Sequence, residues 1–300
     1  MRNFMQMLRA KWTEGKFVCV GLDTDYDKIP LSVKNGLSRS LIDEERICWG
    51  IYQFNKKIID ATKDIVCAYK PNSAFYEQYG ATGLKGLEKT IAYIHEVAPS
   101  MPVILDAKRA DIGNTNEGYV KFAFDYLKAD AITVHPYLGS EAMKPFLDCK
   151  DKGIIVLCRT SNKGAEEFQN FGVSASSMVS FHGDYLYRHV AHTIRHKWNY
   201  NKNCLLLVGA TYPDELKEVR KIVGDMPILI PGIGAQGGDL EKTLEAGFDS
   251  KKEGIIINSS RGIIYASNGV DFAEAARRET LKLHDAISAQ RSLSLQFDRA

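Results

Sequence analysis

One short segment of this chain combines acidic and basic side chains in a way that suits proton transfer. Residues 106–111 read Asp-Ala-Lys-Arg-Ala-Asp and follow the apolar run Pro-Val-Ile-Leu, which predicts a strand over residues 101–106. Because side chains alternate between the two faces of a strand, Asp106 and Lys108 should share one face, about 7 Å apart at the backbone. Asp111 precedes Ile-Gly-Asn-Thr, where glycine suits a turn and the Asn or Thr suits a helix cap, so it is predicted to lie in a loop.

A lysine between two carboxylates is a candidate proton donor. Opposite charges nearby keep an ammonium group protonated, whereas burial favours its neutral form. The alternative interpretation is a solvated cluster of ion pairs, because structural pairs also occur at strand ends. The residues that the fold places beside Lys108 distinguish the two interpretations.

Eight short apolar runs alternate with longer amphipathic segments along the chain. The runs predict strands over residues 17–22, 65–69, 101–106, 131–134, 154–158, 204–208, 227–230 and 254–258. The segments predict helices over residues 44–60, 84–96, 116–127, 141–149, 178–198, 213–223, 240–246 and 271–288. Continuous apolar strands of this kind indicate a parallel sheet covered on both faces, and eight such units indicate a TIM (β/α)8 barrel. We expect a single domain over residues 1–300, of which 45% are hydrophobic.

The carboxyl ends of the strands build the active sites of such barrels. Asp23 follows the first predicted strand and Lys70 the second, so both should converge on the Asp-x-Lys segment. The connections over residues 24–43 and 159–177 are longer than a minimal barrel requires. The second contains Ser161 and is interpreted as a candidate lid, with a plain surface insertion as the alternative.

A glycine-rich loop follows the seventh predicted strand. Within residues 231–239 it has the spacing G-x-G-x-x-G, at Gly232, Gly234 and Gly237. That spacing also occurs in dinucleotide-binding folds, but there it opens a βαβ unit early in the domain, and here only about 60 residues and one strand follow. In a barrel, the loops after strands seven and eight commonly bind phosphate, for which the Gln236 amide and the Arg261 guanidinium are suitable ligands. A glycine turn beside a solvated arginine is the alternative.

The composition excludes several classes of protein. The net charge of +2, from 39 basic and 37 acidic residues, gives no reason to expect binding to nucleic acid. No apolar run approaches the roughly 20 residues of a membrane-spanning helix, and residues 1–16 lack the apolar core of a signal peptide, so we expect a soluble cytoplasmic protein. The six cysteines form no C-x-x-C pair and are predicted to be reduced, without a metal site. His135, near the rim, is expected to be structural.

Taken together, these residues resemble the orotidine 5'-phosphate decarboxylase family over residues 17–263. The most specific parts are Asp106-x-Lys108-x-x-Asp111-Ile112 with Thr115, and Pro231-Gly232-x-Gly234-x-Gln236-Gly237-Gly238 followed by Arg261. The long connections and the sequence Asp-Ala-Lys-Arg resemble those of the longer bacterial branch of that family.

The resemblance implies decarboxylation of orotidine 5'-phosphate to UMP in pyrimidine biosynthesis, without a cofactor. It implies that Lys108 delivers a proton to pyrimidine C6 while Asp106 lies beside the substrate carboxylate, in a charge network with Lys70 and Asp111. The further substrate contacts that it implies are Asp23 to the ribose, Ser161 to the pyrimidine, Ile233 near the leaving carboxylate, and Gln236 and Arg261 to the phosphate.

The resemblance also implies a homodimer in which Asp111 and Thr115 serve the neighbouring subunit's site. Two other functions stay open. One is a magnesium-dependent sugar-phosphate decarboxylase of the same superfamily, which shares the Asp-x-Lys-x-x-Asp motif. The other is a catalytically silent barrel that binds a nucleoside monophosphate, although binding alone needs no lysine between two carboxylates.

Overall fold

Eight parallel strands form one sheet in the computed structural model, which describes residues 2–173, 184–233 and 238–297. The strands are β1 (Val18–Gly21), β2 (Ala68–Lys70), β3 (Ile104–Arg109), β4 (Ala131–Val134), β5 (Gly153–Arg159), β8 (Cys204–Val208), β9 (Ile228–Pro231) and β10 (Ile255–Ser259). Their order is β2-β1-β10-β9-β8-β5-β4-β3, and the bridges Tyr69–Val103 and Asn72–Asp106 join β2 to β3. The sheet therefore closes on itself, and the predicted TIM barrel is confirmed, with a strand in each of the eight apolar runs.

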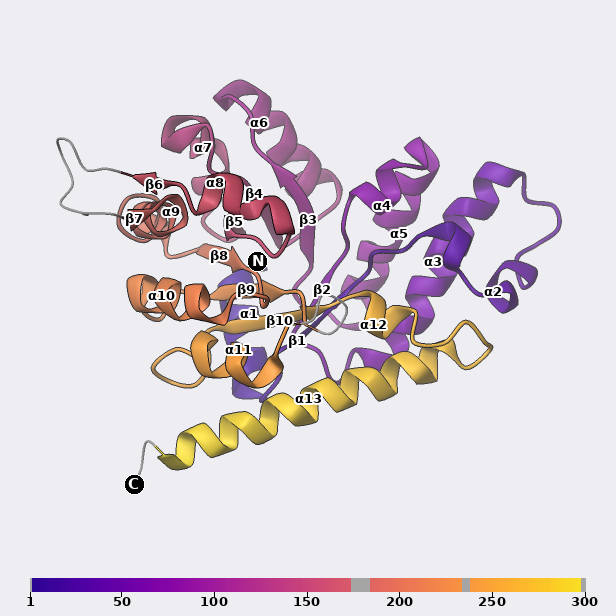
Figure 1. Cartoon of the computed structure of the whole chain (residues 1–300). Coiled ribbons are helices and arrows are strands. Elements are labelled where there is room, and N and C mark those ends of the chain that lie inside the picture. Colours follow the sequence, from indigo (N-terminus) through magenta and orange to yellow (C-terminus); the bar gives the residue numbers. More distant parts are fainter. Residues whose placement is uncertain (1, 174–183, 234–237, 298–300) are drawn as a thin grey trace.

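Helices surround this barrel (Figure 1). They are α1 (Phe4–Thr13), α2 (Leu31–Asn35), α3 (Asp43–Thr62), α4 (Ala74–Glu77), α5 (Gly80–Val97), α6 (Gly113–Val120), α7 (Gly139–Leu147), α8 (Glu166–Gln169), α9 (Leu186–Thr193), α10 (Pro213–Val223), α11 (Leu240–Gly247), α12 (Arg261–Ile264) and α13 (Phe272–Phe297). Two of them continue as π-helical turns, α6 into Lys121–Tyr126 and α9 into Ile194–Trp198. Of the helix predicted over residues 178–198, residues 178–183 lie outside the described residues, and Asp184–Tyr185 form strand β7, which pairs antiparallel with β6 (Gly172–Val173), so the described helix begins only at Leu186.

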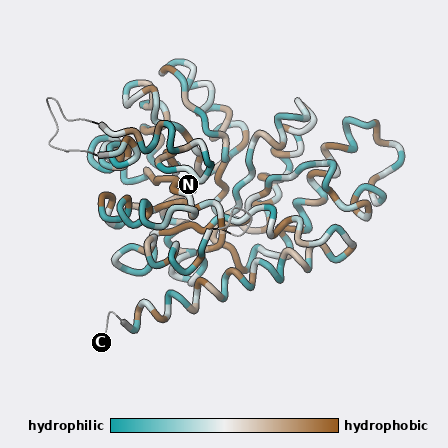
Figure 2. The backbone as a smooth tube through the Cα atoms, viewed as in Figure 1, coloured by the Kyte–Doolittle hydropathy of each residue, from teal (hydrophilic) through white to brown (hydrophobic). Residues whose placement is uncertain are grey.

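Burial explains why the strands are so apolar. All described residues of β1, β4, β8 and β10 are buried, since each strand lies between the barrel interior and a layer of helices. Figure 2 shows this division: the central strands are mostly hydrophobic, and the outer turns of the helices are mostly hydrophilic. Five of the six free cysteines are buried, and burial raises the pKa of the Cys19 thiol to about 12. None of the described helices is long and apolar enough to cross a membrane.

Helix α1 was not predicted from the sequence. Its residues Phe4, Leu8 and Trp12 are buried, and the Trp12 indole donates to the carbonyl of Ile255 at 2.8 Å. The side chain of Asn3 caps the helix by accepting from the backbone of Gln6 at 3.0 Å. An Asn cap followed by apolar residues four apart is the signal that identifies such a helix.

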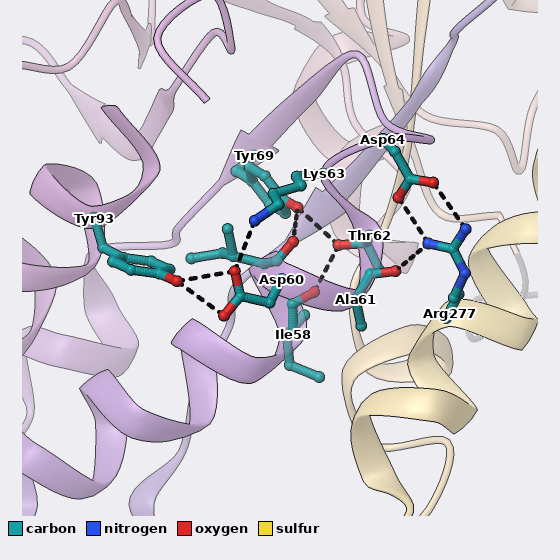
Figure 3. Close-up of polar contacts among 10 residues, drawn as sticks. Ile58, Asp60, Ala61, Thr62, Lys63, Asp64, Tyr69, Tyr93 and Arg277 are labelled. Atoms are coloured by element: carbon teal, nitrogen blue, oxygen red, sulfur yellow. Dashed lines mark hydrogen bonds and ion pairs between the residues drawn. The ribbon is translucent and has the colours of Figure 1, made fainter. Parts of the chain in front are cut away.

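Helix α13 is held against the end of α3 by a bidentate ion pair (Figure 3). Arg277 donates to the two carboxylate oxygens of Asp64 at 2.7 and 2.8 Å, and to the Ala61 carbonyl at 2.6 Å. In the same region, the Thr62 hydroxyl bonds to the phenol of Tyr69, on β2, at 2.7 Å. The end of α3 thereby links the outermost helix to the barrel wall.

Candidate active site

The carboxyl ends of the strands surround a cavity of about 470 Å³. Its lining comes mainly from the ends of seven strands, all but β4, as expected for the catalytic face of a TIM barrel. The predicted site residues that line it are Asp23, Lys70, Asp106, Lys108, Ser161, Ile233 and Arg261. The lysine and the arginine proposed for opposite ends of a substrate therefore face one cavity.

Asp106 is the centre of a charged row on one side of this cavity. Its Oδ2 accepts from Nζ of Lys70 at 2.6 Å, and its Oδ1 accepts from Nζ of Lys108 at 2.7 Å. The prediction that Asp106 and Lys108 share a face is confirmed. The Thr133 hydroxyl also donates to Oδ1 of Asp106, at 2.8 Å, and accepts from the backbone N–H of Lys108 at 3.0 Å. Sequence reasoning missed Thr133, whose only signal is a hydroxyl within the apolar run of β4.

Burial and the charges of this row act in opposite directions on its pKa values. Burial raises the pKa of the Asp106 carboxyl, but the two ammonium groups outweigh it and hold that pKa well below its usual range. Burial likewise lowers the pKa of Lys70, and the carboxylates of Asp106 and Asp23 raise it further than burial lowers it. Asp106 is therefore an anion and Lys70 a cation at neutral pH.

Lys108 has an unusual backbone conformation, with a φ of +47°. This left-handed region costs a non-glycine residue roughly 1–3 kcal/mol, so it persists where the surrounding structure imposes it. Strand β3 continues to Arg109 and carries a bulge against β4 between Leu105 and Arg109. The predicted strand end at Asp106 was too early. The Lys108 side chain, 46% exposed, lies in the cavity, whereas that of Lys70, 4% exposed, lies in the wall.

Two side-chain oxygens in the cavity wall lack a partner. Oδ1 of Asp23 and Oδ1 of Asn258 are buried, and neither accepts a hydrogen bond from any described residue. An unsatisfied buried acceptor costs about 1–3 kcal/mol, so both oxygens suit a ligand that brings hydroxyl or N–H donors. Asn258 was missed from the sequence, where it is the polar residue that ends the predicted eighth strand.

Arg261 adds a further positive charge to the cavity lining. Arg261 is the first residue of α12 and is exposed, and within residues 2–173, 184–233 and 238–297 it has no acidic partner. Gly232, with a φ of +104°, turns the chain at the end of β9 as only glycine does easily. Gln236, together with Gly234 and Gly237, lies outside the described residues.

The predicted lid connection borders the cavity. Thr160, Ser161, Asn162 and Gln169 line it, the last from α8. Ser161 lies against Gly209, where an added Cβ would be only 2.7 Å from the Cβ of Ser161. Residues 174–177 of this connection lie outside the described residues, and its opening and closing stays a prediction.

Comparison with known proteins identifies the family of this chain. The model of the orotidine 5'-phosphate decarboxylase / HUMPS family matches residues 16–276. The chain belongs to this family. A Cellvibrio japonicus protein named orotidine 5'-phosphate decarboxylase is 45% identical over 291 residues, which is 97% of this chain and 100% of that protein. A Ralstonia pickettii protein of the same name is 46% identical, again over 97% of this chain and 100% of that protein.

The solved structures of the orotidine 5'-phosphate decarboxylase family agree. The structure of Leishmania donovani OMP decarboxylase superposes with a TM-score of 0.76 at 35% identity, and the match covers 95% of this chain and 99% of that one. That of Leishmania donovani UMP synthase gives a TM-score of 0.81 at 35% identity, covering 97% of this chain and 57% of that one. The match to UMP synthase thus involves a little over half of that longer chain.

Two residues of the family motif lie elsewhere in this chain. Asp111 and Thr115 do not line the cavity. Oδ1 of Asp111 accepts from the backbone of Ile112 at 2.6 Å, and the Asn116 side chain bonds to both backbone groups of Asp111 at 2.9 and 2.6 Å. The expected cap was wrong: α6 begins at Gly113, because the backbone N–H of Asn116 already bonds to the carbonyl of Ile112 at 3.0 Å, and this places Thr115 inside the first turn.

The other titratable groups suggest no second centre in the described chain. His135 is half-buried on the rim and its Nδ1 accepts only a long bond, 3.4 Å, from the backbone of Tyr137. The described residues hold no group of three or more His, Cys, Asp or Glu arranged to bind a metal ion. The geometry is therefore a charged row, Lys70-Asp106-Lys108, that lines the same cavity as Arg261.

Proposed function

We propose that this protein decarboxylates orotidine 5'-phosphate to UMP in pyrimidine biosynthesis and that it does so without a cofactor. The names of relatives matched over nearly their full lengths support the substrate. The observation that carries the proposal is the charged row around Asp106 in the same cavity as Arg261. A substrate held by its phosphate at Arg261 presents its base to that row.

Lys108 is the proposed proton donor. When the bond between C6 and the carboxylate breaks, its electron pair stays on C6, and carbon dioxide leaves. The Lys108 ammonium stabilises that charge in place and transfers its proton to C6, after which solvent reprotonates the amine. The exposure of Lys108 toward the cavity supports this role, and the burial of Lys70 suits it to holding Asp106 in place.

Asp106 is proposed to lie beside the departing carboxylate. Its anionic state supports this role, because repulsion between two carboxylates favours loss of the one that can leave. Thr133 and Lys70 hold the two oxygens of the Asp106 carboxylate, Oδ1 and Oδ2 respectively. The row is thus arranged before substrate binds, which limits reorganisation during the reaction.

The remaining predicted contacts each bind a different part of the substrate. Asp23 would accept ribose hydroxyls, a role that its unpartnered oxygen supports. Ser161 would meet the pyrimidine, and Ile233, 8% exposed, would form an apolar pocket near the leaving carboxylate. Gln236 and Arg261 would bind the phosphate, and this remote binding energy would favour closure of the connection over residues 159–177.

A homodimer with shared sites is also proposed. Asp111 and Thr115 lie outside this chain's own cavity, as residues that serve a neighbour would. Three apolar side chains are exposed on the same pair of βα units: Ile112 at 57%, next to Asp111, and Tyr137 at 89% and Leu138 at 41%, between β4 and α7. Apolar side chains exposed next to unassigned motif residues support an interface there. Homology to enzymes of pyrimidine biosynthesis supports a cytoplasmic location.

The decisive experiment mixes the purified protein with orotidine 5'-phosphate and follows the ultraviolet change, with UMP identified as the product. We expect turnover that a chelator such as EDTA leaves unchanged. Loss of turnover with the chelator would favour the magnesium-dependent sugar-phosphate decarboxylase, which the names of the full-length relatives do not favour. Binding of UMP without any turnover would favour the silent barrel.

A further inference from the structure

We propose that Gln169 is a positioning residue, which holds the backbone at Thr160 so that Ser161 faces the pyrimidine base. The inference rests on the proposed function, because it concerns recognition of the base in the same cavity. Gln169 comes from α8, while Thr160 and Ser161 follow β5, and all three line the cavity. Their contacts connect the predicted lid to the binding surface for the base.

The amide of Gln169 makes two complementary hydrogen bonds to Thr160. Its Oε1 accepts from the backbone N–H of Thr160 at 2.8 Å, and its Nε2 donates to the Thr160 hydroxyl at 2.9 Å. The hydroxyl in turn donates to Oδ1 of Asn162 at 2.6 Å. This arrangement needs an acceptor and a donor on one planar group, which a carboxamide supplies and a carboxylate does not.

Arg159 holds the third polar group of Thr160 from the core. Its Nη1 donates to the Thr160 carbonyl at 2.9 Å. The Arg159 side chain is fully buried, and its guanidinium lies 3.8 Å from the ring centroid of Tyr212. Carboxylate oxygens of Glu166 and Glu215 lie 3.9 and 3.7 Å from its Nη2, so the buried charge is compensated.

Ser161 is therefore fixed through its neighbours. Thr160 before it has its N–H, carbonyl and hydroxyl all bound by side chains, and Asn162 after it is tied to that hydroxyl. On the other side is the backbone of Gly209, whose N–H donates to the Arg159 carbonyl at 2.7 Å. Of these supports, Gln169 is the one that α8 supplies, so the orientation of Ser161 depends on α8 being in place.

The test compares two ligands, of which only one carries the pyrimidine base that Ser161 would contact. UMP carries the phosphate, ribose and base, and ribose 5-phosphate lacks the base. For Gln169→Ala we expect UMP to inhibit about tenfold more weakly and kcat/KM for orotidine 5'-phosphate to fall about tenfold, the loss expected for one or two hydrogen bonds. Inhibition by ribose 5-phosphate should not change. The matched control is Glu167→Ala, at an exposed neighbour on α8. This variant should be inhibited by both ligands as the unmodified protein is.

A double-mutant cycle tests whether Gln169 acts through Thr160. Thr160→Val removes the hydroxyl at nearly constant volume, and Thr160→Ser retains it and should recover most of the UMP affinity that Thr160→Val loses. The combined Gln169→Ala and Thr160→Val variant should lose about as much UMP affinity as the more damaging single change. Additive losses, equal weakening of both ligands, or unchanged UMP binding would each overturn the proposal.

Two further outcomes are separable. If Gln169→Ala fails to fold, as judged by circular dichroism, the comparison of Thr160→Val with Thr160→Ser carries the test with the same two ligands. If the unmodified protein binds UMP but makes none from orotidine 5'-phosphate, the proposed function fails, and the loss of UMP affinity in Gln169→Ala still decides the role of Gln169.

Discussion

Lys108 and Asp106 lie two residues apart on β3, and Nζ of Lys108 donates to Oδ1 of Asp106 at 2.7 Å. The pair spans a bulge at which Lys108 has a φ of +47°. A regular strand would already place both side chains on one face, and the bulge adds exposure of the ammonium to the cavity. This arrangement leaves the carboxylate buried and the proposed proton donor accessible.

Replacing Lys108 should separate chemistry from binding. We expect Lys108→Ala to reduce turnover by at least about 10³-fold, because proton transfer and charge stabilisation are both lost. Binding of UMP, measured by calorimetry, should remain. Lys63→Ala, at an ion pair at the end of α3, is the matched control and should retain full turnover. Near-normal turnover in Lys108→Ala would refute the assignment of the proton donor.

Replacing Arg261 should weaken the binding of the phosphate specifically. For Arg261→Ala we expect the affinity for UMP to fall about 10- to 100-fold, since a charge-assisted hydrogen bond contributes about 1.5–3 kcal/mol. The affinity for uridine, which has no phosphate, should stay the same. Arg278→Ala, at an exposed ion pair with Asp271, serves as the control. An unchanged affinity for UMP would place the phosphate elsewhere.

Shared active sites can be tested by complementation. Lys108→Ala and Asp111→Ala subunits should each be inactive alone. After random exchange, half of the dimers are hybrids with one intact site, so about a quarter of the sites should regain activity. Subunit exchange is verified with differently tagged chains, and no recovery despite proven exchange would contradict the shared site.

The stability contributed by Asp106 should depend on pH. Its folded-state pKa is depressed, so its contribution is fully present above the unfolded value of about 3.9 and is lost as pH falls from there through the folded value. Asp106→Asn leaves the buried Lys70 unpaired and should lower the free energy of unfolding by about 3 kcal/mol at pH 7. In denaturant titrations, the difference in the free energy of unfolding between the native protein and Asp106→Asn should become smaller below a pH of about 4.

The outcome for a control carboxylate completes that test. Asp148 pairs with Lys144 on the surface, so Asp148→Asn should leave the midpoint of unfolding unchanged at either pH. A difference between the native protein and Asp106→Asn that stays constant from pH 7 to pH 3 would show that the Asp106 carboxylate is not stabilised by its two lysines.

The sequence by itself determined the barrel and most of the cavity lining. Each strand is a continuous apolar run, which is a local pattern, and the closure of eight βα units brings every strand's carboxyl end to one face. Asp23, Lys70 and Arg261 could therefore be assigned to one cavity without coordinates. Asp106 and Lys108 could be paired because the period of a strand is two.

The tertiary structure alone decided what depends on contacts between distant segments. The bulge at Lys108 arises from the register of β3 against β4, and Thr133 reaches Asp106 only because those strands are adjacent. Gln169 meets Thr160 because a short helix folds back over the end of β5. Local periodicity reports which face of its own element a side chain occupies. Register and loop packing depend on residues far away in the chain, so no local pattern contains them.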